Sequence, residues 1–163
     1  MDVETTGLMP HRGDRVIEIG AVKLSDGEDE RGFQSLIKVR KRISAKARLV
    51  HGITGDMLAD QPGAEDVLPS FREFIGNSIL LAHNAPFDIG FLRYEFARLG
   101  LAFTNRYICT LEASRTRLPR LCNYRLETVY RALFGNYQEF RQAHRALCDA
   151  KMVAEIWREI MGR

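Results

Sequence analysis

Two carboxylates stand close together at the start of the chain, in the stretch "MDVETTGL". Alternate side chains of a strand point to the same face, so Asp2 and Glu4 project side by side if this stretch is extended. Like charges at that distance require a cation or a shared proton between them. The elements predicted downstream make this strand central in a sheet, where two acids on one face are unusual. The pair therefore indicates a site for a positively charged group.

Two further acids, Asp88 and Asp149, can join this pair. Asp88 falls in the first turn of a helix predicted after a buried strand, and Asp149 falls at or near the start of the last predicted helix. Either acid alone is explained by the partial positive charge of a helix N-terminus, and that alternative stays open. Four acids in basic surroundings, without a Cys/His cluster, favour a hard divalent ion, Mg²⁺ or Mn²⁺, because such ions prefer oxygen ligands.

The strands that must position these acids predict an α/β fold. The stretch "RVIEIGAVKL" (15–24) is rich in β-branched residues and predicts a strand. A charged turn, "DGEDERG" (26–32), and a second strand, "FQSLIKVR" (33–40), complete a hairpin. The nearly all-apolar run "SILLAH" (78–83) is typical of a strand buried on both faces, and "RYICT" (106–110) indicates a weaker one. Because it contains a hairpin, the sheet cannot be wholly parallel.

Helices are predicted between and after these strands. Helical patterns cover residues 64–76, 86–100, 111–118, 126–134 and 149–161. Pro86 suits the first turn of the second helix, Asn84 can cap it and Gly100 stops it. The apolar face predicted for this helix consists of Phe87, Phe91, Tyr94 and Leu99. The stripe predicted for the last helix consists of Ala150, Val153, Ala154, Trp157 and Met161.

Composition bounds the class of protein. The chain has 163 residues, of which 45% are hydrophobic and 28% charged, as expected of one globular domain with a sizeable core. No apolar run approaches the roughly 20 residues of a membrane span, so we expect no membrane partner. The three cysteines, Cys109, Cys122 and Cys148, lack C-x-x-C spacing. They indicate free or buried thiols in a reducing compartment, and we expect the protein to be cytoplasmic.

Positive charge is concentrated in parts of the chain. A net charge of +3 permits a nucleic-acid partner without arguing strongly for one. The stretch "KVRKRISAKAR" (38–48) carries six basic residues and no acid. Further arginines follow at positions 115, 117, 120, 125 and 131. These residues are either substrate contacts or ordinary solvated surface, and both interpretations stay open.

Three motifs, "DVETTGL", "HNAPFD" and "HRALCDA", resemble in order and spacing the exonuclease motifs of the DEDDh branch of the DnaQ-like family. That family contains the proofreading epsilon subunit of bacterial DNA polymerase III, ribonuclease T and free-standing 3′–5′ exonucleases. "RVIEIGAV" and "HGIT" are similar to the epsilon-like members, and the resemblance runs the length of the chain. The sister branch has a tyrosine where this chain has Arg145, so the histidine branch matches better.

The resemblance implies a fold and an activity. The fold is ribonuclease H-like, with a mixed central sheet, antiparallel in its first strands and then parallel, flanked by helices. The whole of 1–163 forms a single exonuclease domain. The activity is metal-dependent 3′–5′ exonucleolytic hydrolysis of phosphodiester bonds.

Carried over residue by residue, the resemblance implies that two Mg²⁺ or Mn²⁺ ions are held by Asp2, Glu4, Asp88 and Asp149. His144 is then the general base. In two-metal hydrolysis one ion lowers the pKa of the attacking water and the other stabilises the leaving 3′-oxygen. A neutral imidazole, with an unperturbed pKa near 6.5, suits removal of the water's proton. His144 and Asp149 are roughly 140° apart around a helix, so His144 should precede the last helix, in the segment "GNYQEFRQAH" (135–144).

The resemblance also implies contacts with the 3′-terminal nucleotide. The candidate substrate-binding residues are Thr5, Thr6, Gly7, Leu8, His51 and Asn84. The backbone near Thr5 and Thr6 contacts the 3′ end in the family, and Leu8 and His51 flank the last base. Simpler roles stay open, because the threonines can be turn residues, Leu8 core, His51 surface and Asn84 a helix cap.

Two classes of function follow. The first is an active exonuclease that releases 5′-mononucleotides from single-stranded or frayed 3′ ends, DNA in preference to RNA. The second is a catalytically idle nucleic-acid-binding or polymerase-associated domain of the same fold. The presence of His144 and all the motif acids favours the enzyme. The motifs do not separate a proofreading subunit associated with a DNA polymerase, a free-standing exonuclease and an RNA-trimming exoribonuclease.

Only Met1 precedes Asp2, whereas in the family several apolar residues precede the corresponding acid. Strands usually run about 5–6 residues, so the upstream ladder partners of the first strand are missing here. We therefore expect this chain to be a shortened version of a longer functional one, lacking the upstream part of its first strand.

Overall fold

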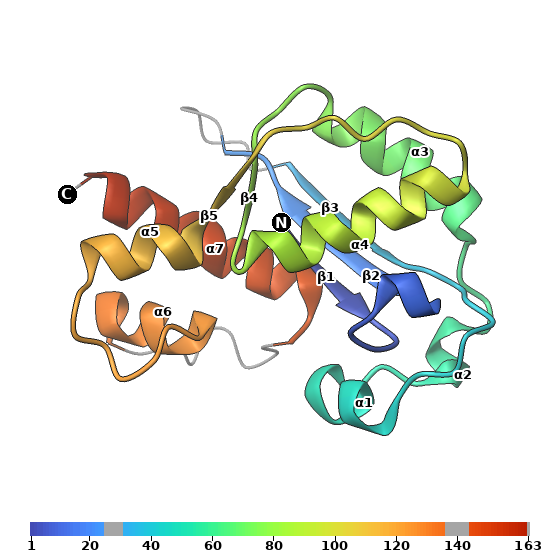
Figure 1. Ribbon diagram of the computed structural model, residues 1–163, viewed down its shortest axis with the longest axis horizontal. Coiled ribbons are helices and arrows are strands. Elements are labelled where there is room, and N and C mark those ends of the chain that lie inside the picture. Colours follow the sequence, from blue (N-terminus) through green and yellow to red (C-terminus); the bar gives the residue numbers. More distant parts are fainter. Residues whose placement is uncertain (25–30, 136–143, 163) are drawn as a thin grey trace.

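The computed structural model describes residues 1–24, 31–135 and 144–162 (Figure 1). Its strands are β1 (Asp2–Thr5), β2 (Val16–Val22), β3 (Gly32–Leu36), β4 (Leu80–Ala82) and β5 (Tyr107–Cys109). Its helices are α1 (Ala45–His51), α2 (Gly55–Leu58), α3 (Ala64–Ile75), α4 (Ala85–Arg98), α5 (Thr110–Arg117), α6 (Leu126–Phe134) and α7 (Ala146–Gly162), with a 3-10 turn, η1 (Pro10–Arg12). The predicted strands and helices are present. Most of the charged turn predicted at 26–32 lies outside the described residues.

The first three strands form an antiparallel ladder in the order β1-β2-β3. The predicted hairpin is therefore confirmed, and β2 is its central strand. The second strand of the hairpin ends at Leu36, earlier than predicted. Beyond Leu36 the chain pairs with the segment ahead of α3. Lys38 forms a bridge with Gly63, and the Lys38 main-chain nitrogen donates to the Pro62 oxygen at 2.9 Å.

The remaining strands, β4 and β5, form a parallel pair in which Leu81 lies opposite Ile108. They run beside β1 (Figure 1), and the main-chain nitrogen of Met1 donates a hydrogen bond of 2.6 Å to the Leu81 oxygen. The antiparallel and parallel ladders thus meet at Met1. The predicted mixed sheet is confirmed.

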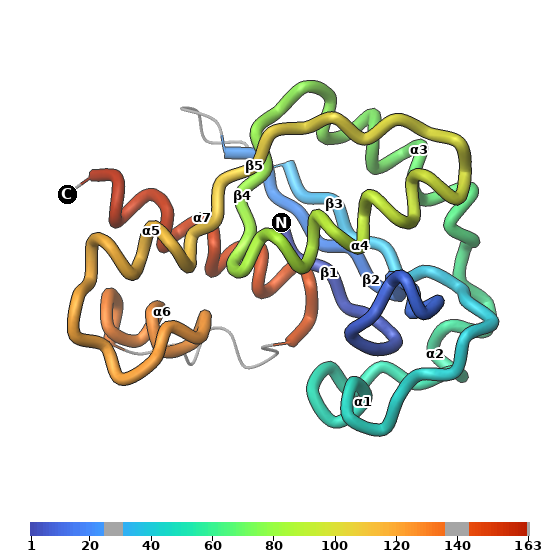
Figure 2. Tube along the Cα trace, viewed as in Figure 1, coloured from blue at the N-terminus to red at the C-terminus, as the bar shows by residue number. Residues whose placement is uncertain are grey.

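Helices cover both faces of the antiparallel ladder. Odd-numbered side chains such as Val3 and Ile19 belong to the main core, together with Phe71 of α3 and Phe91 of α4. The other face meets the start of α7, which approaches β2 closely at Gly20. A separate core joins α5, α6 and the later turns of α7 at one end of the molecule (Figure 2).

The buried face predicted for α4 is confirmed in part, because Phe91 is buried and Phe87 and Leu99 pack against the main core. Tyr94 is 47% exposed, whereas Ile89, Leu92 and the acid Glu95 are buried. Glu95 is buried because Arg15 donates to both of its carboxylate oxygens, at 2.7 and 2.8 Å. A pattern based on apolar residues counts such an acid as exposed, so it does not reveal this part of the buried face.

The ends of α4 and α7 agree with the predictions only in part. Asn84 stands at the N-cap of α4, but its backbone is left-handed, with φ of 69°, and its side chain makes no capping hydrogen bond. Gly100, with φ of 66°, follows the end of α4 as predicted. In α7 the stripe is correct at Ala150, Val153 and Ala154, whereas Met161 is 54% exposed. No helix among the described residues is long and apolar enough to cross a membrane.

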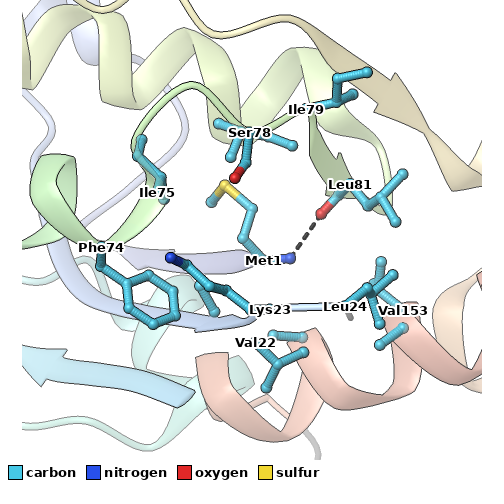
Figure 3. A pocket seen from close by; sticks show the side chains of 14 residues that line it. Met1, Val22, Lys23, Leu24, Phe74, Ile75, Ser78, Ile79, Leu81 and Val153 are labelled. Atoms are coloured by element: carbon cyan, nitrogen blue, oxygen red, sulfur yellow. Dashed lines mark hydrogen bonds between the residues drawn. The ribbon is translucent and has the colours of Figure 1, made fainter. Parts of the chain in front are cut away.

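A cavity of about 200 Å³ opens beside Met1 (Figure 3). Its walls come from residues 22–24 at the end of β2, from residues 78–81 leading into β4, and from α3 and α7. Phe74 and Ile75 of α3 and Val153 of α7 supply apolar side chains (Figure 3). The cavity lies directly upstream of β1, between β2 and β4.

Candidate active site

The start of the chain places two acids on one face of β1. Asp2 lies opposite Gly20 and Glu4 opposite Glu18 in the register with β2. The register shifts directly after Glu4, between Glu4 and Thr5. Such irregularities bend a strand and redirect its side chains, and they are common next to active sites. The predicted side-by-side arrangement of Asp2 and Glu4 is confirmed.

Two helices bring the other predicted acids to the same place. Carboxylate oxygens of Asp2, Glu4 and Asp149 lie within 4.8 Å of one another. Asp88 is 2% exposed, and its Oδ1 accepts a hydrogen bond of 3.1 Å from the main-chain nitrogen of Val3, between the two β1 acids. Mg²⁺ binds oxygen at about 2.1 Å, so ligands on opposite sides of one ion are about 4.2 Å apart. The spacing of the acids therefore suits a divalent cation.

Burial and mutual repulsion disfavour the ionised forms of these acids. The pKa of Asp2 is raised well above its usual value, first by burial and then by Asp88, Glu4 and Asp149. Burial, followed by the charge of Asp149, raises the pKa of Glu4 to about 9. Burial also raises the pKa of Asp88 to about 7 and that of Asp149 to about 6. A bound cation would reverse this preference, because it stabilises the charged carboxylates.

His144 lies immediately ahead of α7, as predicted, and the rest of the segment from 136 to 143 lies outside the described residues. Its main-chain nitrogen donates to the Asp149 carboxylate at 3.2 Å. Its backbone is left-handed, with φ of 66°. The imidazole Nε2 lies 3.3 Å from Oε1 of Glu127 on α6. The His144 side chain is 44% exposed and can reach solvent.

The turn after β1 is rigid. The Thr5 hydroxyl donates to the Gly7 oxygen at 2.6 Å, and the Thr6 hydroxyl donates to Asp14 at 3.2 Å. A Cβ on Gly7 would lie 2.4 Å from the Asp14 carboxylate, so a larger residue there would displace that side chain from its contacts with Thr6 and Met9. Both threonine side chains are therefore structural, and Thr5, Thr6 and Gly7 are all buried.

The other candidate substrate-binding residues lie in different environments. Leu8 is 75% exposed and is not part of the core. His51 is buried, with Nε2 3.2 Å from the Thr5 oxygen and Nδ1 accepting from the Ile53 nitrogen at 2.9 Å. Burial lowers the pKa of His51. Asn84 is exposed at the start of α4.

A cleft of about 800 Å³ runs over the acid cluster. Its lining residues include Asp2, Asp149, His144, Asn84, Val50, Tyr124, Arg115, Arg125 and Glu127. Arg115 and Arg125 thus line the same cleft as Asp2 and Asp149. Arg42 and Arg48 line a separate groove beside α1. Only part of the positive charge noted in the sequence lies at the cleft.

The sequence matches the RNase_T exonuclease family over residues 1–157. The chain belongs to this exonuclease family. The exonuclease is 39% identical over 155 residues to the PolC-type DNA polymerase III of Clostridium perfringens, an alignment covering 95% of this chain and 10% of that protein. It is 36% identical over 168 residues to the epsilon subunit of DNA polymerase III of Rickettsia felis, and this alignment covers 99% of this chain and 72% of that protein. The exonuclease therefore spans about a tenth of its PolC-type relatives and most of the epsilon subunit.

Two solved structures resemble the exonuclease along its length. Exonuclease X in complex with 5′-overhanging duplex DNA has 32% identity and a TM-score of 0.75, covering 99% of this chain and 89% of that one. The nuclease domain of 3′hExo, a DEDDh family member bound to rAMP, has 20% identity and a TM-score of 0.81. The match covers 99% of this chain and 89% of that one. The latter supports the fold alone. These matches confirm the predicted DnaQ-like DEDDh family, the ribonuclease H-like fold and the exonuclease activity. Of the two predicted classes of function, they support the active enzyme and not the catalytically idle domain.

Sequence reasoning missed two acids of this exonuclease that flank His144. Glu127 contacts the imidazole from α6, and Glu18 on β2 binds Arg145 directly after it. Glu18 lies in "RVIEIGAV", a stretch that indicates a strand and a resemblance to the family but no role for its acid, and Glu127 lies in no motif. The specific roles assigned to Asp2, Glu4, Asp88, Asp149 and His144 stay predictions.

Proposed function

We propose that this exonuclease removes 5′-mononucleotides from 3′ ends, using two Mg²⁺ or Mn²⁺ ions held by Asp2, Glu4, Asp88 and Asp149. The carboxylate cluster on the floor of the cleft carries this proposal. Like charges gathered in a buried site lower stability unless a cation compensates them. When bound, such ions activate a water molecule and stabilise the leaving 3′-oxygen.

His144 acts as the general base and takes the proton from the attacking water. Its position supports this role, because the imidazole is 44% exposed and lines the same cleft as Asp2 and Asp149. A neutral imidazole has a lone pair that accepts the proton near neutral pH. The hydrogen bond from the His144 nitrogen to Asp149 keeps the base next to a metal ligand.

The substrate strand lies along the cleft with its 3′ end at the acids. The backbone of the turn from Thr5 to Gly7 contacts the terminal nucleotide, and Leu8, His51 and Asn84 lie beside it. Leu8 offers an exposed apolar surface on which a base can stack. Arg115 and Arg125 bind phosphates further along the strand.

We propose DNA as the preferred substrate, with single-stranded or frayed 3′ ends favoured because a paired end must first be melted. The 32% identity to exonuclease X, solved with DNA, and the DNA polymerase relatives support this choice. The same relatives support association with a DNA polymerase and a proofreading role. The free thiols of Cys109, Cys122 and Cys148 fit a cytoplasmic enzyme.

The test digests 5′-labelled single-stranded DNA, the matched RNA, and duplex DNA with a paired or mismatched 3′ end, each with Mg²⁺ or Mn²⁺. The expected product is a ladder that shortens from the 3′ end, fastest on single-stranded DNA and faster on the mismatched than on the paired duplex. Faster digestion of RNA would overturn the DNA preference. A ladder that does not shorten from the 3′ end would overturn the direction.

A further inference from the structure

Glu18 is a buried acid that the proposed mechanism does not use. Its side chain is 0% exposed, on β2 opposite the metal-site acid Glu4. Arg145 Nε donates to the two Glu18 oxygens at 3.1 and 3.2 Å, and Arg145 Nη2 donates at 2.8 Å. The Ala146 nitrogen and Gln34 Nε2 donate to the same carboxylate at 3.1 and 3.0 Å. With its oxygens engaged in this way, Glu18 is not free to bind a metal ion.

The contacts of Glu18 fix the chain directly after His144. Arg145 is the next residue, and Ala146 is the first residue of α7. Glu18 therefore binds a side chain and a main-chain nitrogen on two successive residues. The guanidinium bonds through two nitrogens, which fixes its orientation as well as its distance. The peptide that carries His144 is thereby attached to the central strand of the antiparallel ladder.

This attachment matters because the backbone of His144 is in an unfavourable conformation. Its φ of 66° lies in the left-handed region, which residues other than glycine rarely adopt. The surrounding contacts must hold it there. On one side the His144 nitrogen donates to Asp149, and on the other side Glu18 holds Arg145 and Ala146.

We propose that Glu18 and Arg145 form a clamp that positions His144 over the acid cluster, so that both are positioning residues for the reaction. The proposal rests on the proposed function, in which His144 is the general base. Without the clamp, the His144 peptide relaxes from its left-handed conformation and the imidazole moves out of reach of the attacking water. A displacement of about 1 Å can cost about 100-fold in rate.

Removal of the Arg145 charge distinguishes a role in positioning His144 from a role in supporting the metal site. Removing the guanidinium leaves the Glu18 carboxylate, next to Glu4, without its positive partner. The added negative potential strengthens cation binding or leaves it unchanged. Loss of the clamp therefore lowers turnover without weakening Mn²⁺ binding, whereas damage to the metal site lowers both.

The experiment compares Arg145→Ala, Arg145→Lys, Glu18→Gln, His144→Ala and the double variant of Arg145→Ala with His144→Ala on single-stranded DNA. Arg72→Ala is the control, because Arg72 is an exposed arginine of α3 away from the cleft. Arg145→Ala is expected to lower kcat by about 10–100-fold, with KM within about twofold and Mn²⁺ affinity equal or tighter by calorimetry. Glu18→Gln should lower kcat to a similar extent, but its Mn²⁺ affinity should be equal or weaker, because this change removes a negative charge opposite Glu4 and leaves Arg145 unpaired. Arg145→Lys should recover part of the loss in kcat.

The double variant decides how Arg145 acts. If it acts through His144, the double variant is no slower than His144→Ala, because residues that act as a unit are not additive. A loss equal to the product of the single losses would overturn the clamp, as would wild-type kcat in a folded Arg145→Ala variant. Wild-type turnover of His144→Ala would instead overturn the base assignment in the proposed function. The Arg145 side chain is 30% exposed, so we expect its variants to fold.

Discussion

At the scale of single residues, the raised pKa values of the acids determine how the metal-free protein responds to pH. The pKa of Glu4 is about 9 and that of Asp88 about 7 in the folded state, above the usual carboxyl values of 4.5 and 3.8. The folded state therefore binds more protons than the unfolded state between pH 4.5 and 9, and its stability falls as the pH rises.

We expect the melting temperature in EDTA to fall between about pH 5.5 and pH 8.5, with a shallower fall in Glu4→Gln, which lacks one titrating acid. Saturating Mn²⁺ should raise the melting temperature most at the higher pH, where the ligands are most readily deprotonated. Thermal melts by circular dichroism measure this. The same slope in Glu4→Gln as in the wild type would show that Glu4 does not carry the effect.

The cleft arginines give a second prediction at this scale. Arg115 lines the cleft, and its guanidinium lies 5.8 Å from the ring centroid of Tyr124. Arg115→Glu should raise KM for single-stranded DNA and flatten the dependence of KM on salt, because a phosphate contact is lost. Steady-state assays at several salt concentrations test this, with Arg72→Glu as the control. Equal KM values in the two variants would assign Arg115 to ordinary surface.

Spacing in the sequence revealed some site residues and could not reveal others. Asp2 and Glu4 were found because strand alternation is local. Glu18 and Arg145 are separated by 127 positions and meet only through the docking of α7 on β2. Nothing in the local pattern around Glu18 distinguishes a paired acid from an exposed one.

At the scale of elements, the contact between β2 and α7 sets the position of the site. A Cβ on Gly20 would lie 2.1 Å from main-chain atoms of Ala146 and Leu147. No larger residue fits unless the start of α7 moves away from the strand. Asp149 is on that helix and His144 just before it, so the same contact fixes a predicted metal ligand and the predicted base.

Gly20→Ala should therefore lower the free energy of unfolding by about 1–3 kcal/mol, the usual cost of overpacking, and should reduce turnover as well. Gly90→Ala in α4 is the matched control, because nothing lies within 4 Å of its added Cβ. That change should leave activity unaltered and raise stability by up to about 1 kcal/mol. Urea unfolding and kcat of both variants measure this, and equal behaviour would contradict the close docking.

The ends of helices were predictable from the sequence where a local residue type, such as glycine, terminates the helix. Gly76, with φ of 49°, ends α3 as predicted. The burial of Glu95 in α4 did not follow the apolar pattern, because Arg15 pairs with it from a distant part of the chain. Pairing between charges far apart in sequence is invisible to hydrophobic periodicity.

At the scale of the whole molecule, residues at the end of β2 and in β4 border the cavity beside Met1 (Figure 3). The Lys23 nitrogen bonds to Arg31 on the β3 side, so the N–H and C=O of Val22 point the other way, into the cavity. The Leu80 nitrogen bonds to Arg106 on the β5 side, so the Leu81 N–H also points into the cavity. Among the described residues, β1 pairs with β2 only as far as Gly20.

We therefore predict that about four to six β-branched residues added ahead of Met1 will extend β1 to normal length. The extension should raise the melting temperature by several degrees, about 2–4 °C for each kcal/mol gained, and should tighten Mn²⁺ binding by holding Asp2 and Glu4 more firmly. A Gly/Ser extension of equal length is the control. Identical melting of the two extended chains would show that the cavity does not accept a strand.

The class of fold was predictable because the hairpin, the buried run and the helical periods are all local signals. The meeting of the two ladders at Met1 was not predictable, because the Met1–Leu81 hydrogen bond joins residues 80 positions apart.

The central claim is that the acid cluster holds the metal ions that cut the 3′-terminal phosphodiester bond. The most direct measurement is the rate of mononucleotide release from single-stranded DNA as free Mn²⁺ is varied, for the wild type and for Asp2→Ala, Glu4→Ala, Asp88→Ala and Asp149→Ala. The predicted result is saturable dependence on Mn²⁺ in the wild type, no release in EDTA, and release near background in each folded variant. Release that persisted in EDTA, or at the wild-type rate in Asp88→Ala, would contradict the account.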